Sequence, residues 1–209
     1  MPEYSQIQTY IKYNEQTFNE VLIKAGDLFL EFGINKKLLD NWIKDISWKV
    51  EDNGFVYTWC DFETQKIKIL NTDIDLQIRP LISGFLSQEF YDVVKVELLF
   101  HTDEIEDYRT NKLTKEIGQI IWKSLNKFWD YFKEAGVYFT DEAQDCKALD
   151  AIHSNNIEEL YQFDLAIIPN KFEYLYKNIS TEFTCKRISD ALVIARTCRW
   201  ETLPWDANY

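Results

Sequence analysis

The stretch VELLFHTDEIED, residues 96–107, combines the residue types that acid–base and metal chemistry require. An apolar, strand-like run ends at His101, and four carboxylates follow within six residues: Asp103, Glu104, Glu106 and Asp107. Carboxylate oxygens suit magnesium, manganese or calcium, and a histidine with a pKa near neutrality can act as a ligand or a proton shuttle. The stretch therefore raises the hypothesis of a metal or acid–base site at the end of a strand.

A second acidic group follows the next strand that the sequence predicts. Strands at 92–100 and 137–140 flank a helix at about 110–134, whose apolar residues recur at three- and four-residue steps. If the two strands are parallel, this unit is a right-handed βαβ crossover, and both following loops leave the same edge of the sheet. The second loop carries Asp141, Glu142 and Asp145. The two groups of carboxylates could then converge on one cation.

That convergence would make the protein a divalent-metal-dependent hydrolase. Its candidate catalytic residues are His101, Asp103, Glu104 and Asp141. Its candidate ligands for Mg²⁺ or Mn²⁺ are Asp103, Glu104, Asp141 and Asp145. A structural explanation competes with this one, because acids are also favourable at helix starts, where they complement the dipole, and Thr140 is placed to act as an N-cap. The D-x-D-x-D-G calcium loop is absent.

Other catalytic and cofactor-binding patterns are missing from the sequence. It contains no G-x-G-x-x-G, no P-loop, no G-x-S-x-G and no H-E-x-x-H. Four cysteines form no C-x-x-C pair, and the two histidines add no zinc-ligand spacing. Cys146 and His153, on one expected helix, would stand roughly 10 Å apart, beyond hydrogen-bond reach. We therefore expect no cofactor and favour a protein that is not an enzyme.

Charge and aromatic content point toward protein binding. A net charge of −12 opposes binding to nucleic-acid phosphates or an anionic membrane and could steer a basic partner. On a predicted strand at 54–61, Phe55, Tyr57 and Trp59 share one face; burial trends place that face in the core, whereas exposure would make it a binding platform. A row of lysines on the 110–134 helix could meet an acidic partner or simply face solvent: Lys112, Lys115, Lys123 and Lys127.

The fold that the sequence predicts is one α+β domain spanning residues 1–209. Its N-terminal part, about 1–45, reads as helical, with Gly33 ending one helix and Asn35 capping the next. An antiparallel meander follows, with strands near 46–51, 54–61 and 66–70, a hairpin turn at Asn53-Gly54, and a short helix or loop around 74–88. Together with the βαβ-like unit, these strands would form one mixed sheet with helices packed on it.

Our leading hypothesis is a non-enzymatic interaction protein that binds a basic protein partner through an acidic, aromatic-edged surface. An inhibitor, an immunity protein or a defence-related regulator would fit that chemistry. The residues assigned to the surface are Glu104, Glu106, Asp107, Tyr57 and Trp59. A structural subunit of a homo-oligomer is a further alternative to the hydrolase. No secretory signal or apolar run of roughly 20 residues is visible, so we expect a cytoplasmic protein.

Overall fold

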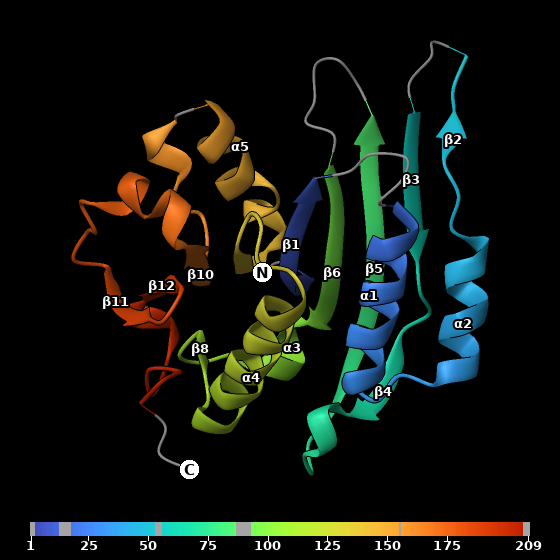
Figure 1. Cartoon of the computed structure of the whole chain (residues 1–209). Helices are drawn as coiled ribbons and strands as arrows, with labels where there is room; N and C mark the ends of the chain where they lie inside the picture. The colour runs from blue at the N-terminus through green and yellow to red at the C-terminus, as the bar shows by residue number, and fades with distance from the viewer. Residues whose placement is uncertain (1–2, 13–17, 53–55, 87–92, 155, 207–209) are drawn as a thin grey trace.

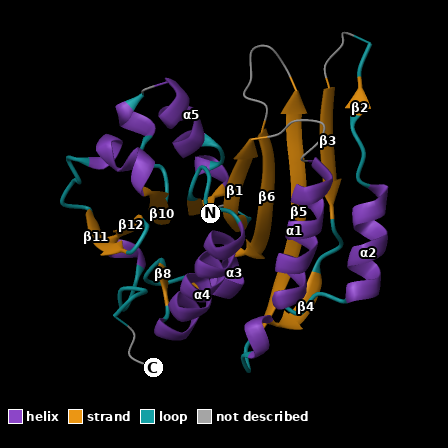
Figure 2. Ribbon diagram, viewed as in Figure 1, coloured by secondary structure: helices purple, strands orange, loops and turns teal. Residues whose placement is uncertain are grey.

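The structure is a computed structural model that describes residues 3–12, 18–52, 56–86, 93–154 and 156–206. One large sheet runs through the molecule, with helices on both faces (Figures 1 and 2). Its strand order is β11-β12-β10-β9-β1-β6-β5-β3-β2, with β4 beside β5. The predicted α+β class, with helices packed on one sheet, is confirmed. No helix among the described residues is long and apolar enough to cross a membrane.

The strands of the large sheet are β1 (Tyr4–Lys12), β2 (Lys49–Val50), β3 (Val56–Asp61), β4 (Gln65–Lys68), β5 (Asp75–Leu86), β6 (Val93–His101), β9 (Val137–Asp141), β10 (Leu165–Pro169), β11 (Phe183–Ile188) and β12 (Ala191–Arg196). A small separate ribbon consists of β7 (Glu106–Asp107) and β8 (Lys112–Leu113). The α-helices are α1 (Phe18–Glu31), α2 (Lys36–Asp45), α3 (Thr102–Ile105), α4 (Lys115–Tyr131) and α5 (Lys147–Ser154). Short 3-10 helices are η1 (Ile69–Asn71), η2 (Glu142–Gln144), η3 (Ile157–Glu159), η4 (Asn170–Tyr176) and η5 (Thr197–Arg199).

The first strand lies in the middle of the sheet, and here the predicted helical N-terminus is wrong. β1 pairs with β6 on one side and with β9 on the other, so almost all of its residues are buried. Its β-branched residues alternate at Ile7, Thr9 and Ile11, which is a strand period. The prediction is confirmed for α1 and α2, whose apolar stripes do recur at helical spacing.

The predicted βαβ-like unit exists with one strand inserted. β6 and β9 both pair antiparallel with β1, so they run parallel to each other while α4 connects them. Because β1 lies between them, β6 and β9 do not pair with each other. Every described pairing in the sheet is antiparallel, so the sheet is not mixed. The loops after β6 and β9 nevertheless leave the same edge, since His101 lies opposite Tyr4 and Asp141 lies opposite Ser5.

The segment 74–88, predicted as a short helix or loop, contains the long strand β5. Pro80 obscured it, because proline lacks the amide that a central strand normally uses. β5 pairs with β4 at residues 75–78 and with β3 at residues 81–86, so Pro80 lies in the gap between these two ladders. Its carbonyl still accepts a hydrogen bond from the Phe62 amide at 3.0 Å. The predicted Asn53-Gly54 turn lies outside the described residues, between the paired strands β2 and β3.

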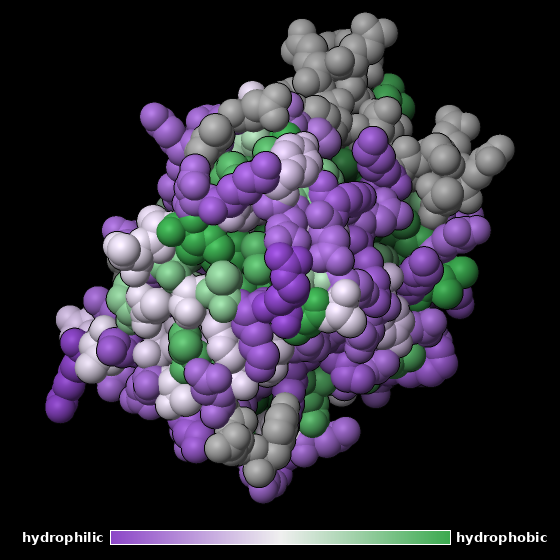
Figure 3. Space-filling view, turned by 60° about the vertical axis from the view of Figure 1, so that its left-hand side comes forward, coloured by the Kyte–Doolittle hydropathy of each residue, from purple (hydrophilic) through white to green (hydrophobic). Residues whose placement is uncertain are grey.

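Two hydrophobic cores lie on opposite faces of the sheet. α1, α2 and α4 cover the face that presents Ile7, Val96 and Leu98, and α5 with η4 covers part of the other face, over Tyr10 and Tyr138. Figure 3 views the molecule from the side of α5 and β11, where hydrophobic residues form small groups among hydrophilic ones. The second face of β6 presents Lys95 and Glu97, because side chains alternate along a strand.

Asn35 caps α2 as predicted, and its replacement tests that cap. Its side-chain oxygen accepts from the amides of Lys37 and Leu38 at 3.0 and 3.2 Å. Asn35→Ala leaves those amides without a side-chain acceptor, and we expect it to lower the free energy of unfolding by about 1 kcal/mol. Asn41→Ala, at an exposed position within α2, is the matched control and should cost nothing. Urea unfolding followed by circular dichroism measures both; equal values would contradict the capping role.

Candidate functional site

Three of the acids that follow β6 are engaged within the chain. Glu104 accepts from both the backbone and the side-chain amide of Gln77, each at 2.6 Å. Asp107 accepts from the Arg109 amide at 2.7 Å, closing a turn. The side chain of Glu106 is 5% exposed and is paired with Arg199. Asp103 is exposed. Through Glu104 and Glu106, the acidic stretch therefore binds the chain after β6 to Gln77 and Arg199.

The acids after β9 are engaged separately from the first group. Asp141 caps η2 by accepting from the Gln144 amide at 3.0 Å, and Asp145 binds Lys95 at 2.8 Å. His101 packs against the ring of Tyr4, with centroids 4.8 Å apart. Although the two loops share an edge, nowhere in the described ranges do three His, Cys, Asp or Glu side chains form a group that could hold a metal ion. The ligand set of the hydrolase hypothesis is thus not brought together.

A different charged cluster lies on the second face of the sheet, where the link that leads into α5 meets β6. Lys95 places its ammonium 3.0 Å from a carboxylate oxygen of Glu97 and donates to both oxygens of Asp145, at 3.0 and 2.8 Å. Glu97 comes from β6 itself, and Asp145 comes from the link between η2 and α5. The Glu97 side chain is only 1% exposed. The buried ammonium of Lys95 is therefore paired with two carboxylates, Glu97 on the same strand and Asp145 from a distant part of the chain.

The hydrogen bonding of this cluster is incomplete. Across the described structure, neither oxygen of Glu97 has a hydrogen-bond donor in good geometry, so its contact with Lys95 is an ion pair without an aligned hydrogen bond. The hydroxyl of Ser83, which lies opposite Lys95 on β5, also finds no hydrogen-bond partner there. Polar atoms buried in this way raise the free energy of the folded state unless they change protonation or find a partner.

Burial is the largest single influence on the pKa values in the cluster, and for Glu97 it decides the direction of the shift. Loss of water raises the pKa of Glu97 to about 7, against the opposing effect of Lys95, and nearby Asp145 and Asp61 raise it further. Burial works to lower the pKa of Lys95, but Glu97 and Asp145 raise it overall, so the ammonium stays charged. Glu97 therefore exchanges its proton close to neutral pH, which an exposed glutamate does not do.

Cys146 closes the same cluster but is a poor nucleophile there. It directly precedes α5 and has a φ of +60°, a left-handed conformation that L-residues rarely adopt. Its thiol donates to Asp145 at 3.5 Å, and burial raises its pKa to about 12. The thiolate, which is the reactive form, is therefore scarce. His153 stands near the other end of α5, so the helix separates the two residues, as the spacing predicts.

A second buried charged network joins three distant segments around Arg199. Its guanidinium donates to Asp164 at 2.7 Å, to the Asn111 carbonyl at 2.7 Å and to Glu106. Arg196 binds the other oxygen of Asp164 at 3.2 Å. Burial raises the pKa of Asp164, and the two arginines oppose that effect. The network explains why Glu106 is not available at the surface.

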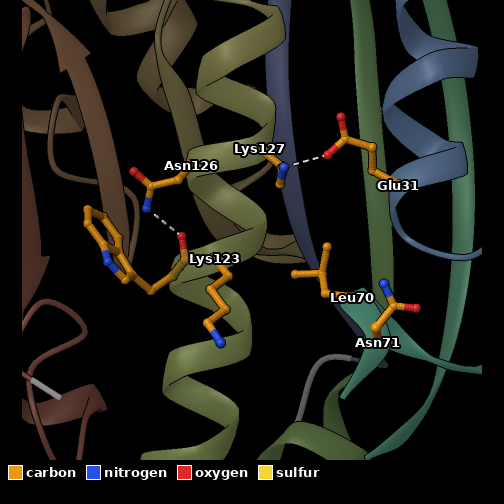
Figure 4. Close-up of a pocket in the computed structure, with 7 residues that line it drawn as sticks. Glu31, Leu70, Asn71, Lys123, Asn126 and Lys127 are labelled. Atoms are coloured by element: carbon orange, nitrogen blue, oxygen red, sulfur yellow. Dashed lines mark hydrogen bonds and ion pairs between the residues drawn. The ribbon is translucent and has the colours of Figure 1, made fainter. Parts of the chain in front are cut away.

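A pocket of about 620 Å³ lies between α4, the end of α1 and η1 (Figure 4). Lys123 and Lys127 of the predicted lysine row line it, opposite Leu70 and Asn71, both of which have left-handed backbone conformations. Glu31 pairs with Lys127 and accepts from the Tyr131 hydroxyl at 2.7 Å. These contacts lower the pKa of Glu31, chiefly through Lys127. Glu31 thus ties α1 to α4 beside this pocket.

The aromatic face of β3 is turned outward rather than into the core. Trp59 is 47% exposed and Tyr57 is half-buried, while Thr58 on the opposite face is fully buried. Core burial, the more favoured of the two predictions, is therefore wrong for Trp59; Phe55 lies outside the described residues. Strand register places Trp59, Ser83 and Lys95 in one row across the second face. The exposed indole thus lies two strands from the buried ammonium.

The sequence contains a signal for the Lys95 cluster that its motifs did not reveal. Lys95 and Glu97 are charged residues in an otherwise apolar strand, VVKVELLF. They are two residues apart, so both side chains point to the same face of the sheet. Charged residues are rarely buried without a partner, so this pattern predicts a partner from elsewhere. Comparison of the chain with protein-family models, with curated proteins and with solved structures gave no match.

Proposed function

We propose that the protein is a non-enzymatic interaction protein that binds a basic protein partner on the face of β3 carrying Tyr57 and Trp59. The exposure of Trp59 carries the proposal, because tryptophan is buried to a large extent on average and is enriched at interface hot spots. Tyr57 lies on the same face, two residues away. Glu104, Glu106 and Asp107 make contacts within the chain, so we centre the proposed surface on β3 rather than on the acidic stretch after β6.

The charge around these rings supports a basic partner. Residues 45–63 contain five carboxylates and one lysine, a net charge of −4. Asp61 shares the face of Trp59 and accepts from its indole N–H at 3.3 Å. The ammonium of Lys49 lies 5.9 Å from the centroid of the Tyr57 ring, so this ring already receives a cation. Carboxylates beside aromatic rings favour lysine and arginine side chains over neutral ones. An inhibitor or immunity protein facing a basic target would use such a surface.

Site-specific photocrosslinking tests the proposal in the native cell. A benzophenone amino acid at position 59 should form a covalent adduct with a basic protein, and the adduct should weaken when Asp61 is changed to Lys. The same amino acid at Tyr174, which is 60% exposed on η4, is the matched control and should give no such adduct. Equal adducts at both positions, or an acidic partner at position 59, would contradict the proposal.

Affinity for the captured partner provides the quantitative check. We expect Trp59→Ala to weaken binding by at least about tenfold, because truncating an interface tryptophan commonly removes more than 1 kcal/mol. Tyr174→Ala should leave binding unchanged. The association rate should fall as salt is raised, since steering by exposed carboxylates is screened. Isothermal titration and stopped-flow measurements give these values; a Trp59→Ala variant that binds normally would remove β3 from the interface.

A further inference from the structure

The segment from Glu142 to Ser154 follows β9 and joins the sheet to α5. Asp141 caps η2, and the chain then turns sharply at Cys146 before α5 begins. α5 buries Ala148, Leu149 and Ala151 over the second core. Between η2 and α5, the ion pair of Asp145 with Lys95 is the electrostatic contact that joins the segment to β6. Its strength therefore affects whether α5 stays in place.

Lys95 is shared between two acids that differ in accessibility. Asp145 keeps about a third of its side chain exposed, whereas Glu97 is almost completely buried. A single ammonium cannot satisfy both carboxylates as well as it satisfies one, because each additional negative charge in the site repels the other. The groups that face Glu97 are Lys95 on its own strand, Asp61 from β3, Tyr10 from β1, and Asp145 with Cys146 from the segment leading into α5. Arg79 on β5 is turned toward the ring of Tyr4 instead, 4.7 Å from its centroid.

We propose that Lys95, Glu97 and Asp145 form a proton-controlled clasp that holds α5 on the sheet. When the Glu97 carboxyl carries its proton, Lys95 is paired with Asp145 alone, and the clasp is closed. When that proton is released to solvent, the ammonium is divided between two carboxylates, and the excess negative charge weakens the hold on Asp145. α5 then separates from the sheet more often. The pH range of this change is set by Glu97, around neutrality.

Hydrogen–deuterium exchange of the whole protein tests the clasp. After correction for the intrinsic pH dependence of exchange, protection of amides in residues 147–154 should fall by about tenfold between pH 6 and pH 8.5. Protection of β1 amides, which reports opening of the whole sheet, should also fall, because ionised Glu97 destabilises the whole fold, but at each pH it should stay well above the protection of residues 147–154. In Glu97→Gln the segment should stay protected at both pH values. In Asp145→Asn, which removes the clasped carboxylate, the segment should be weakly protected at both.

Each result decides the question. Equal pH dependence in the wild type and Glu97→Gln would overturn the proposal, as would protection in α5 that equals the protection of β1 at every pH, because α5 would then open only together with the sheet. If Glu97→Gln does not fold, Asp145→Asn still discriminates, because a clasp predicts pH-independent exchange in that variant. A Glu63→Gln variant, at an exposed position, controls for loss of a carboxylate and should behave like the wild type. The test needs no partner protein and is independent of the proposed function.

Discussion

Arg199→Met is expected to lower the free energy of unfolding at pH 7 by about 3–5 kcal/mol, because it leaves the buried carboxylate of Glu106 without its cation and leaves Asp164 with Arg196 alone. The side chains of Glu106 and Asp164 are only 5% and 7% exposed, and Arg199 contacts both. Methionine keeps much of the side-chain volume, so the loss would be electrostatic rather than a cavity. Urea unfolding at constant ionic strength measures the difference.

The pH dependence of the Arg199→Met variant distinguishes this cause from simple loss of packing. The guanidinium opposes the effect of burial on Asp164, so without it the folded-state pKa of Asp164 rises further, the folded variant takes up a proton as the pH falls, and the deficit should shrink toward pH 4. Adding Glu106→Gln should recover part of the loss. Arg187→Met breaks an exposed pair with Glu173 and is the matched control; its stability should be unchanged. A deficit that is constant with pH would point to packing instead.

Glu97→Gln is expected to stabilise the protein at pH 8.5, by an amount on the order of 2–3 kcal/mol. The folded-state pKa of Glu97, about 7, lies above the ordinary value of 4.5. The folded protein therefore holds a proton that the unfolded chain has lost between these two pH values. Stability from this residue is full below about pH 4.5 and is lost as the pH rises through 7. Glutamine cannot ionise, so the variant keeps this stability as the pH rises.

The measurement is the difference in unfolding free energy between wild type and Glu97→Gln at several pH values. The difference should be near zero at pH 4, grow most steeply between pH 5 and pH 7 and level off above about pH 7.5. Glu63→Gln, at an exposed site, should show no such profile. A variant that is less stable than the wild type at pH 8.5 would mean that the ion pair with Lys95 outweighs the burial of the carboxylate.

Local sequence patterns predicted those parts of the fold whose structure is decided locally. Helical spacing located α1, α2 and α4, and Asn35 identified the start of α2. β1 and β5 were missed because both are central strands. Burial on two sides removes the simple alternation of polar and apolar residues, and Pro80 is tolerated only because two partner strands leave a gap beside it. That gap depends on tertiary pairing, which a single segment does not reveal.

The candidate site was harder to predict because its members come from distant segments. The acids at 103–107 and 141–145 were correctly placed at one edge of the sheet, but Gln77, Arg199 and Lys95 then bound them individually. Each of these partners lies at least 27 residues away in the chain. The sequence predicted that Tyr57 and Trp59 share one face of a strand, but alternation alone does not determine which face of β3 is covered by helices. That choice depends on where α1, α2 and α5 pack.

The central position of β1 also constrains the order of events during folding. Its partners are β6, which begins at Val93, and β9, which begins at Val137. On the ribosome, β1 has no partner in the sheet until β6 has emerged, and its other edge stays unpaired until β9 follows. Such non-local pairing slows folding and leaves a β-prone segment open to wrong partners in the meantime. β1 is therefore open to mispairing for the whole interval in which residues 13–92 are synthesised.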